Sequence, residues 1–363
     1  DSHLALPIID VPKERLDSIE LKPFQAAIDA GIKGIMTAHI AIPELTGGNG
    51  TPSTLAPEIL TGLLKDEMGF DGLVFTDAMD MYAIDRLHPR PEAAVLALEA
   101  GADVILMPPS PQAALEGIVT AVEEGRITED RLDRSVRKVL QAKEDLGLHR
   151  KATVPVEEVV QSVGIGEHEE VAQEIANRSI TLLKNDGDLL PLLGTRSARV
   201  MSVRYRGSTD LMAGRIMDAR LRQKYPRLST ADVGRDTRSD VYESLLQQAR
   251  RSNLVVVSLY VTVVSYSGRV AIPEQAAGFI QALAKEGISH VVVSFGNPYL
   301  FSEFPDAQAY LLAWSGAEVS QRAAAQALFG EIPIVGTTPT GIPPYFSIAD
   351  GILLPIRETG RDF

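Results

Sequence analysis

The sequence predicts an α/β protein that folds as two regions. Three observations predict this class. Apolar runs of strand length alternate with amphipathic runs of helix length, which is the pattern of parallel strands joined by helical crossovers. Hydrophobic residues make up 45% and charged residues 23% of the chain, as in ordinary globular proteins. The length of 363 residues corresponds to two domains at roughly 100–200 residues each.

The first region covers residues 1–150. Its strands are expected at 34–40, 72–77 and 103–107, and its helices at 56–67, 92–100, 111–124 and 129–146. Thr54 is a candidate N-cap for the first of these helices, and Gly101 ends the second. A spacing of roughly 35 residues per strand–helix unit suits an α/β barrel. Such a barrel closes with eight strands, whereas three are recognisable here.

A connector at residues 151–165 leads into the second region, which spans 166–350 and is followed by a tail at 351–363. Its strands are expected at 179–183, 199–203, 253–260, 290–295 and 309–313, and its helices at 167–176, 240–251, 272–285 and 318–329. This order indicates an open doubly wound sheet. The region contains no Gly-rich loop of the G-x-G-x-x-G or P-loop kind, and no cofactor is expected.

Composition and charge exclude several classes of protein. The net charge of −13 argues against nucleic acid as a partner, because nucleic-acid-binding proteins carry a basic face. The chain has no cysteine, which excludes disulfides, thiolate zinc sites and cysteine nucleophiles. No transmembrane segment is expected, because the apolar runs fall far short of roughly 18 residues. The histidines show no metal-ligand spacing of the H-E-x-x-H kind, so no metal is expected.

Asp77 is the first candidate for chemistry. It stands at the end of an apolar strand and is followed by small or apolar residues. A glycosidase nucleophile requires an ionised carboxylate that is held rigidly at the floor of a cleft. The alternative is an aspartate that caps the next helix. Asp80 and Asp85 are interpreted as surface or capping residues.

Two histidines are further candidates. In the run Asp1-Ser2-His3, residues i and i+2 of an extended chain lie on one face, so the carboxylate can orient the imidazole for proton transfer. On spacing alone, a frayed terminus or a tag remnant is the simpler explanation of this run. His39 ends a predicted strand, where it either contacts substrate or serves as a hydrogen-bonded core histidine.

Several stretches of the chain resemble glycoside hydrolase family 3 in order and spacing. In the first region these are 34–43 (GIMTAHIAIP), 55–72 (LAPEILTGLLKDEMGFDG), 73–81 (LVFTDAMDM) and 134–148 (RSVRKVLQAKEDLGL). In the second region they are 179–192 (SITLLKNDGDLLPL) and 329–343 (FGEIPIVGTTPTGIP). The resemblance implies the C-terminal part of a (β/α)8 TIM-type barrel followed by an α/β/α sandwich domain.

Two motifs resemble the β-N-acetylglucosaminidase (β-N-acetylhexosaminidase) subgroup of this family. One is the run 76–79 (TDAM), and the other is Asp1-Ser2-His3 followed a few residues later by Leu-Pro. The resemblance implies that Asp77 is the nucleophile, His3 the general acid/base and Asp1 its orienting partner. It also implies that His39 and Met79 contact substrate, which would be an N-acetylglucosamine-containing glycan or muropeptide.

The resemblance further implies that the first five barrel strands precede Asp1 and carry sugar-binding groups. Residues 1–363 alone are therefore expected to be neither a stable barrel nor active, and the missing N-terminal barrel half is an expected partner. A bacterial role in peptidoglycan turnover is implied, in the cytoplasm or after export.

Three alternatives remain open at this point. The protein is a β-glucosidase or β-xylosidase of the same family, for which Glu303 and Glu318 are candidate acids in the second region. A second alternative is that phosphate rather than water accepts the sugar, because a neutral imidazole repels an anion less than a carboxylate does. Or the chain is a non-catalytic carbohydrate-binding or interaction protein.

Overall fold

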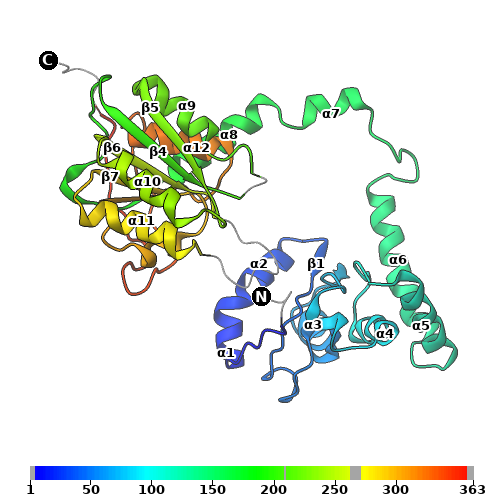
Figure 1. Ribbon diagram of the computed structural model, residues 1–363. Helices are drawn as coiled ribbons and strands as arrows, with labels where there is room; N and C mark the ends of the chain where they lie inside the picture. The colour runs from blue at the N-terminus through cyan, green and yellow to red at the C-terminus, as the bar shows by residue number, and fades with distance from the viewer. Residues whose placement is uncertain (1–4, 208–209, 262–270, 358–363) are drawn as a thin grey trace. The chain divides into compact units, whose positions relative to one another are not determined.

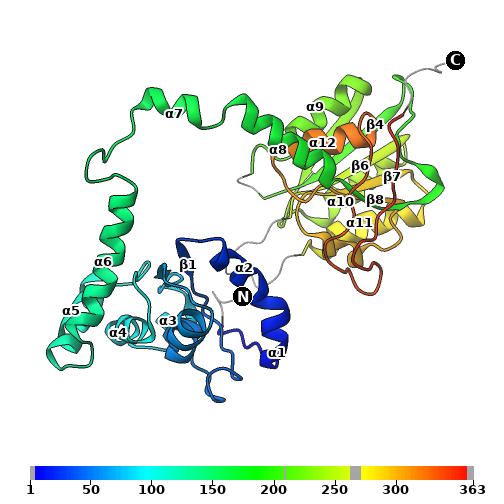
Figure 2. The ribbon, with the colours of Figure 1, turned by 180° about the vertical axis from the view of Figure 1, so that it is seen from behind.

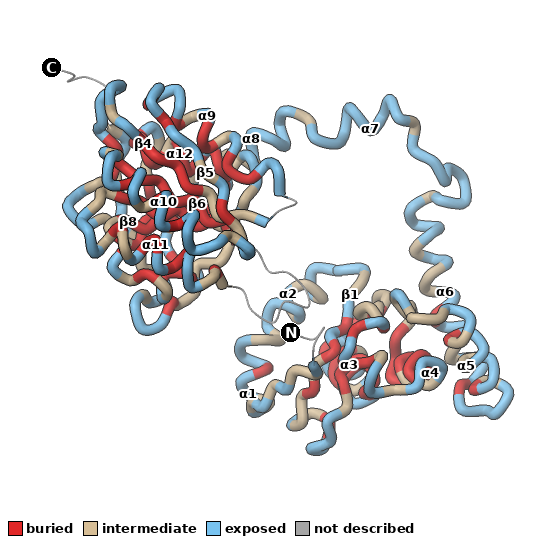
Figure 3. Tube along the Cα trace, in the orientation of Figure 1, coloured by how far each residue is buried: buried red, intermediate tan, exposed pale blue. Residues whose placement is uncertain are grey.

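The computed structural model describes residues 5–207, 210–261 and 271–357. The chain divides into two compact units, Asp1–Val156 and Glu157–Phe363 (Figures 1 and 2). The division falls inside the segment 151–165 that was expected as a connector. This segment contains helix α7 (Val156–Ser162), whose residues are all exposed (Figure 3). Within the described residues, no helix is both long enough and apolar enough to cross a membrane.

The first unit is α/β, with short strands and mostly helical connections. Its elements are α1 (Lys13–Arg15), η1 (Leu16–Glu20), α2 (Lys22–Asp29), β1 (Gly34–Met36), η2 (Ser53–Leu55), η3 (Glu58–Glu67), β2 (Leu73–Phe75), α3 (Tyr82–Asp85), α4 (Arg90–Ala100), α5 (Pro111–Glu123) and α6 (Glu129–Asp145). Apolar side chains of η3, β2 and α4 form its main core, including Leu60, Val74 and Ala97. Gly101 follows α4 with a φ of 128°, so the prediction that it ends this helix is confirmed.

Strands β1 and β2 pair in parallel, with Gly34 opposite Leu73 and Met36 opposite Phe75. The strand expected at 103–107 is reduced to a single parallel bridge between Phe75 and Val104. The described residues of this unit therefore show a two-stranded sheet and no closed barrel.

Two predictions about the first unit were wrong in detail. The strand expected at 34–40 ends at Met36, so His39 lies beyond it. Thr54 is not an N-cap, because it lies within η2, and Pro57 directly precedes η3. The Thr54 hydroxyl is fully buried and bonds instead to polar groups that follow β1. These long-range partners replace the local capping bond that the sequence suggested.

The second unit is a mixed sheet with helices on both faces. Its elements are α8 (Gly166–Ser179), β3 (Thr181–Asn185), η4 (Asp186–Asp188), β4 (Arg199–Tyr205), α9 (Arg215–Lys224), β5 (Arg227–Val233), α10 (Ser239–Ala249), β6 (Leu254–Leu259), α11 (Glu274–Lys285), β7 (His290–Ser294), η5 (Pro298–Glu303), β8 (Ala309–Leu312) and α12 (Glu318–Leu328). Helices α8, α9 and α12 pack on one face of the sheet, and α10 and α11 pack on the other. Figure 3 shows the buried strands between them.

The strand order is β3-β8-β7-β6-β4-β5, and β3 runs antiparallel to β8 while the other pairs are parallel. The sheet is thus open and covered by helices on both faces, as expected, and its antiparallel edge strand β3 makes it a mixed sheet. On the free side of β3, the amide of Ile352 donates to the Leu182 carbonyl over 2.7 Å. The segment after Phe346 thus bonds to the sheet although it forms no helix or strand of its own.

The sequence did not predict β5 or α9. Strand β5 lies at the edge of the sheet, and four of its seven residues are exposed, so it lacks an apolar run. Helix α9 is strongly charged, and its buried positions include Asp218, whose carboxylate pairs with Arg204 over 2.8 Å. Packing against the rest of the sheet stabilises both elements, whereas their own sequences give only a weak local signal.

His290 on β7 is a core histidine with both ring nitrogens satisfied. It is 1% exposed, its Nδ1 lies 2.8 Å from the Ile288 carbonyl, and its Nε2 accepts from the Gln308 amide over 3.1 Å. Burial is the largest cause of a lowered pKa for this imidazole. Protonation would place a second N–H against the Gln308 amide, so the folded unit holds the neutral ring.

This histidine should make the stability of the second unit depend on pH. Below the ordinary value of about 6.5, the unfolded chain takes up a proton that the folded chain refuses, so stability falls on acidification by up to about 1.4 kcal/mol per pH unit. The single tryptophan, Trp314, lies in this unit and reports its unfolding in urea by fluorescence. We expect His290→Gln to flatten the slope between pH 6.5 and 5.5, whereas the exposed His168→Gln should not. An equal slope in both variants would contradict this assignment.

Candidate active site

The candidate site lies where β1 and β2 end. Because these strands are parallel, the residues that follow them meet at one edge of the sheet. The amide of Thr37 donates to the Phe75 carbonyl over 2.8 Å, and the amide of Thr76 donates to Val104 over 3.0 Å. Asp77 therefore emerges between the segments that follow β1 and α4. This is the edge at which α/β enzymes place reactive groups.

Asp77 is half-buried, and a backbone amide binds its carboxylate. Its Oδ1 accepts from the Ala78 amide over 2.8 Å, and its own amide donates to the Thr37 hydroxyl over 3.3 Å. The buried Thr76 hydroxyl accepts from the Leu106 amide over 2.9 Å, and the Met79 amide donates to the Leu106 carbonyl over 3.0 Å. The carboxylate is thus fixed in position and still reaches solvent, as a nucleophile requires.

His39 is 1% exposed and has partners at both ring nitrogens. Its Nδ1 lies 2.8 Å from the Thr54 hydroxyl, and its Nε2 lies 2.9 Å from the Ala78 carbonyl. Burial is the largest cause of a lowered pKa for this imidazole, against smaller raising effects that include Asp77 and Asp80. Of the two roles left open by the sequence, this geometry favours the hydrogen-bonded core histidine. Substrate contact by His39 stays a prediction.

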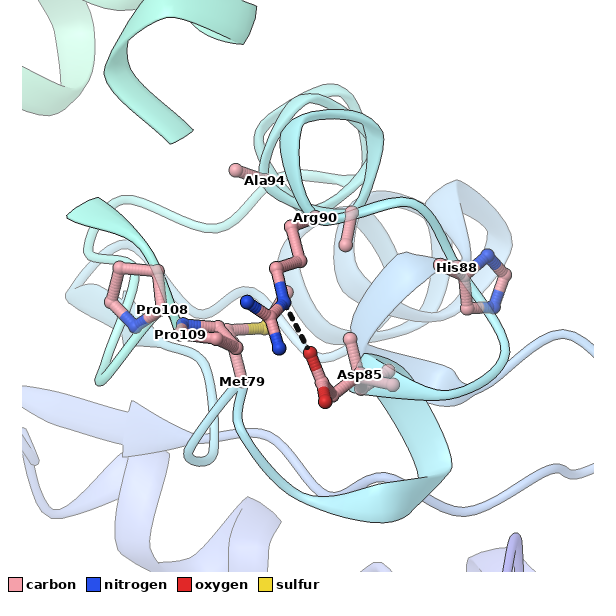
Figure 4. A pocket seen from close by; sticks show the side chains of 9 residues that line it. Met79, Asp85, His88, Arg90, Ala94, Pro108 and Pro109 are labelled. Atoms are coloured by element: carbon pink, nitrogen blue, oxygen red, sulfur yellow. Dashed lines mark hydrogen bonds and ion pairs between the residues drawn. The ribbon is translucent and has the colours of Figure 1, made fainter. Parts of the chain in front are cut away.

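Met79 is also buried, at 2% exposure, and borders a small pocket (Figure 4). The pocket is lined by Met79, Ile84, Asp85, His88, Arg90, Ala93, Ala94, Pro108 and Pro109. Asp85 pairs there with Arg90 over 2.8 Å, so it is an ion-pair partner. Met79 supplies apolar surface to this pocket, and its contact with substrate stays a prediction.

The remaining candidates are distributed as follows. Asp1 and His3 lie outside the described residues. Asp80 is exposed. Glu303 is half-buried at the end of η5 and Glu318 is exposed at the start of α12, and both belong to the second unit, whereas Asp77 belongs to the first. The described residues contain no group of three or more His, Asp or Glu side chains that could hold a metal ion.

Sequence reasoning missed Thr37 and the true role of Thr54 in this site. Thr37 follows β1 at the same edge as Thr76 follows β2, so its place in the strand order was an available signal. Thr54 carried no such signal, because its partners lie 15 and 17 residues away along the chain.

Two family models match the chain. The model of the glycosyl hydrolase family 3 N terminal domain matches residues 1–142, and that of the glycosyl hydrolase family 3 C-terminal domain matches residues 180–351. The chain belongs to this family, and the predicted family resemblance is confirmed.

Known proteins that are similar to the chain include the following three. A β-N-acetylglucosaminidase/β-glucosidase of Cellulomonas fimi is 27% identical over 93% of this chain and 63% of its own length. The structure of a family 3 β-N-acetylglucosaminidase from Paenibacillus sp. str. FPU-7 is 31% identical with a TM-score of 0.79, over 93% of this chain and 64% of that chain. The structure of the β-glucoside phosphorylase BglX is 25% identical in sequence with a TM-score of 0.80, and the match covers 93% of this chain and 63% of that chain. The chain spans less than two thirds of the length of these relatives.

Proposed function

We propose that this protein is a retaining glycoside hydrolase that releases terminal β-linked N-acetylglucosamine. The observation that carries the proposal is the fixed, solvent-reaching carboxylate of Asp77 at the carboxyl edge of β1 and β2 in a family 3 chain. We place this edge in the C-terminal part of a (β/α)8 barrel, where such an edge carries catalytic groups.

The proposed mechanism has two steps. A carboxylate oxygen of Asp77 attacks the anomeric carbon, the bond to the leaving oxygen breaks, and imidazolium His3 gives that oxygen its proton. His3 then removes a proton from water, and the water oxygen displaces Asp77 from the sugar. Asp1 stabilises the imidazolium that is present before the first step and after the second, and it orients the neutral ring between them. Two displacements restore the β configuration.

The sugar is proposed from three lines of support. The run 76–79 and the run Asp1-Ser2-His3 follow the pattern of the N-acetylglucosaminidase subgroup. The relatives from Cellulomonas fimi and Paenibacillus are both named for activity on β-N-acetylglucosaminides. The first of these is also named a β-glucosidase, so glucosides are the competing substrate. A muropeptide from the cell wall is the natural substrate that we propose.

The substrate assignment can be tested with three 4-nitrophenyl glycosides. We expect kcat/KM for the β-N-acetylglucosaminide to exceed that for the β-glucoside and the β-xyloside by about tenfold or more, because hydrogen bonds to the acetamido group would go unmade with the smaller sugars. A larger kcat/KM on the glucoside would overturn the assignment.

The acceptor can be tested in the same assay by adding phosphate. Release of free N-acetylglucosamine at an unchanged rate supports hydrolysis. Accumulation of the sugar 1-phosphate would instead support phosphorolysis, an activity for which one of the similar structures is named.

A further inference from the structure

Four side chain and backbone contacts form a closed ring around the Asp77 segment. The Asp77 amide donates to the Thr37 hydroxyl over 3.3 Å, and this hydroxyl lies 2.8 Å from that of Thr54. The Thr54 hydroxyl lies 2.8 Å from His39 Nδ1, and His39 Nε2 lies 2.9 Å from the Ala78 carbonyl. The ring therefore starts and ends on adjacent residues of the chain, one of which is the proposed nucleophile.

We propose that His39, Thr54 and Thr37 are positioning residues, whose hydrogen bonds run in one direction and hold the nucleophile segment in its reactive geometry. This inference rests on the proposed function, because it assigns these residues a role toward Asp77. It gives His39 a task other than contact with the sugar.

The direction of the ring follows from the capacity of each group to donate or accept. The Ala78 carbonyl can only accept, so Nε2 of His39 carries the proton. In the neutral imidazole Nδ1 then accepts, and the Thr54 hydroxyl must donate to it. The Thr54 oxygen is left to accept from Thr37, whose own oxygen accepts the Asp77 amide. The Thr54 oxygen also lies 3.2 Å from the Ala38 carbonyl, a longer contact than the 2.8 Å to Nδ1, so the Thr54 proton is assigned to the nearer acceptor.

The other neutral tautomer does not fit this ring. A proton on Nδ1 would leave the lone pair of Nε2 facing the lone pairs of the Ala78 carbonyl at 2.9 Å. A doubly protonated imidazole would find acceptors on both sides, but His39 is 1% exposed and burial lowers its pKa. The neutral ring with its proton on Nε2 is therefore the form that the site holds.

The ring acts on the two peptide groups beside the nucleophile. It fixes the N–H of Asp77 and the C=O of Ala78, while the amide of Ala78 binds Asp77 Oδ1 over 2.8 Å. The carboxylate is thus hydrogen-bonded to a short backbone segment that the ring holds in place. A displacement of about 1 Å at a reacting group can cost about 10²-fold in rate.

The ring is itself anchored by neighbouring backbone bonds. Next to Thr54, the Ser53 amide donates to the Ile40 carbonyl over 2.7 Å, and the Ser53 hydroxyl donates to the same carbonyl over 2.8 Å. Thr37, Thr54 and His39 are all buried. Water is therefore kept from these three side chains and cannot substitute for a missing member.

The test is a set of threonine variants of the protein that carries this chain. Thr54→Val keeps the shape and removes the hydroxyl, and Thr54→Ser keeps the hydroxyl. We expect Thr54→Val to lower kcat by about 10²-fold with KM changed by less than about threefold, and Thr54→Ser to recover most of the loss. Thr46→Val is the matched control, because Thr46 is also a buried threonine of the first unit and its hydroxyl donates to the carbonyls of Ile42 and Asn49, outside the ring.

Two further measurements report on the ring without using activity. The ¹⁵N spectrum of His39 should show a neutral imidazole that is protonated on Nε2. Hydrogen exchange of the Asp77 amide should be faster in Thr54→Val than in the wild type or in Thr46→Val. An equal loss of kcat in Thr46→Val, or unchanged amide exchange in Thr54→Val, would overturn the positioning role. A His39 imidazole protonated on Nδ1 would overturn the proposed direction of the four hydrogen bonds. If Asp77 proves not to be the nucleophile, the spectrum and the exchange rates still report on the ring, so the two failures are distinguishable.

Discussion

Replacement of Asp77 with glycine should lower kcat by about 10⁴- to 10⁶-fold, the loss that follows removal of a catalytic nucleophile. In the proposed mechanism the carboxylate attacks the anomeric carbon, and glycine leaves an open space in its place. Asp80→Gly is the matched control, because it removes an exposed carboxylate three residues further along. We expect this control to retain activity within about threefold.

The space left by Asp77→Gly allows a sharper test with azide. Azide should attack the anomeric carbon from the side that Asp77 occupied, displace the activated leaving group and give a glycosyl azide of the α configuration. A single displacement inverts the sugar, whereas the wild-type enzyme retains it. Recovery of activity through a β-azide would place the nucleophile elsewhere.

Covalent labelling identifies the nucleophile directly in the wild-type protein. A slow fluorinated β-glycosyl fluoride should leave one sugar on the peptide that contains Asp77, and the label should be absent from Asp77→Gly. A label on any other carboxylate would contradict the assignment.

The sequence was sufficient to locate most of the elements that carry buried apolar runs. Strands β6 and β7 are buried at every position, and their predicted ranges coincide with the observed strands to within one or two residues. Strand β5 could not be found in this way, because an edge strand exposes much of its surface and needs few apolar residues. Its pairing with β4 is a property of the whole sheet.

The residues of the candidate site likewise differ in whether the local sequence marks them. Asp77 could be singled out as a candidate from the sequence because an apolar strand that ends in a carboxylate is a local pattern. The role of Thr54 could not, because it depends on a bond to His39 across 15 residues of irregular chain. Hydrogen bonds between loops at a sheet edge leave no periodic signal in a sequence. The geometry of such a site therefore has to come from a structure, even where its chemistry can be read from motifs.

Asp103 ties the site's strand β2 to helix α6 and should contribute strongly to the stability of the first unit. Its carboxylate is 2% exposed and accepts from the Val74 amide over 3.1 Å and from the Ser135 hydroxyl. The guanidinium of Arg131 lies 3.8 Å away and donates to the carbonyls of Leu98 and Ala102. Removing this carboxylate leaves the Val74 amide and the Ser135 hydroxyl without this acceptor, and the largely buried Arg131 cation without its opposite charge.

We therefore expect Asp103→Ala to lower the free energy of unfolding of the first unit by about 3–5 kcal/mol, the cost of breaking a buried charged pair. The surface control Asp71→Ala, which removes a 98% exposed carboxylate, should lower it far less. Circular dichroism in urea follows both units, whereas Trp314 fluorescence follows only the second. An early transition seen by circular dichroism and absent from the fluorescence would show that the loss is confined to the first unit. Equal urea midpoints for Asp103→Ala and Asp71→Ala would contradict the prediction that Asp103 stabilises the first unit more than an exposed carboxylate does.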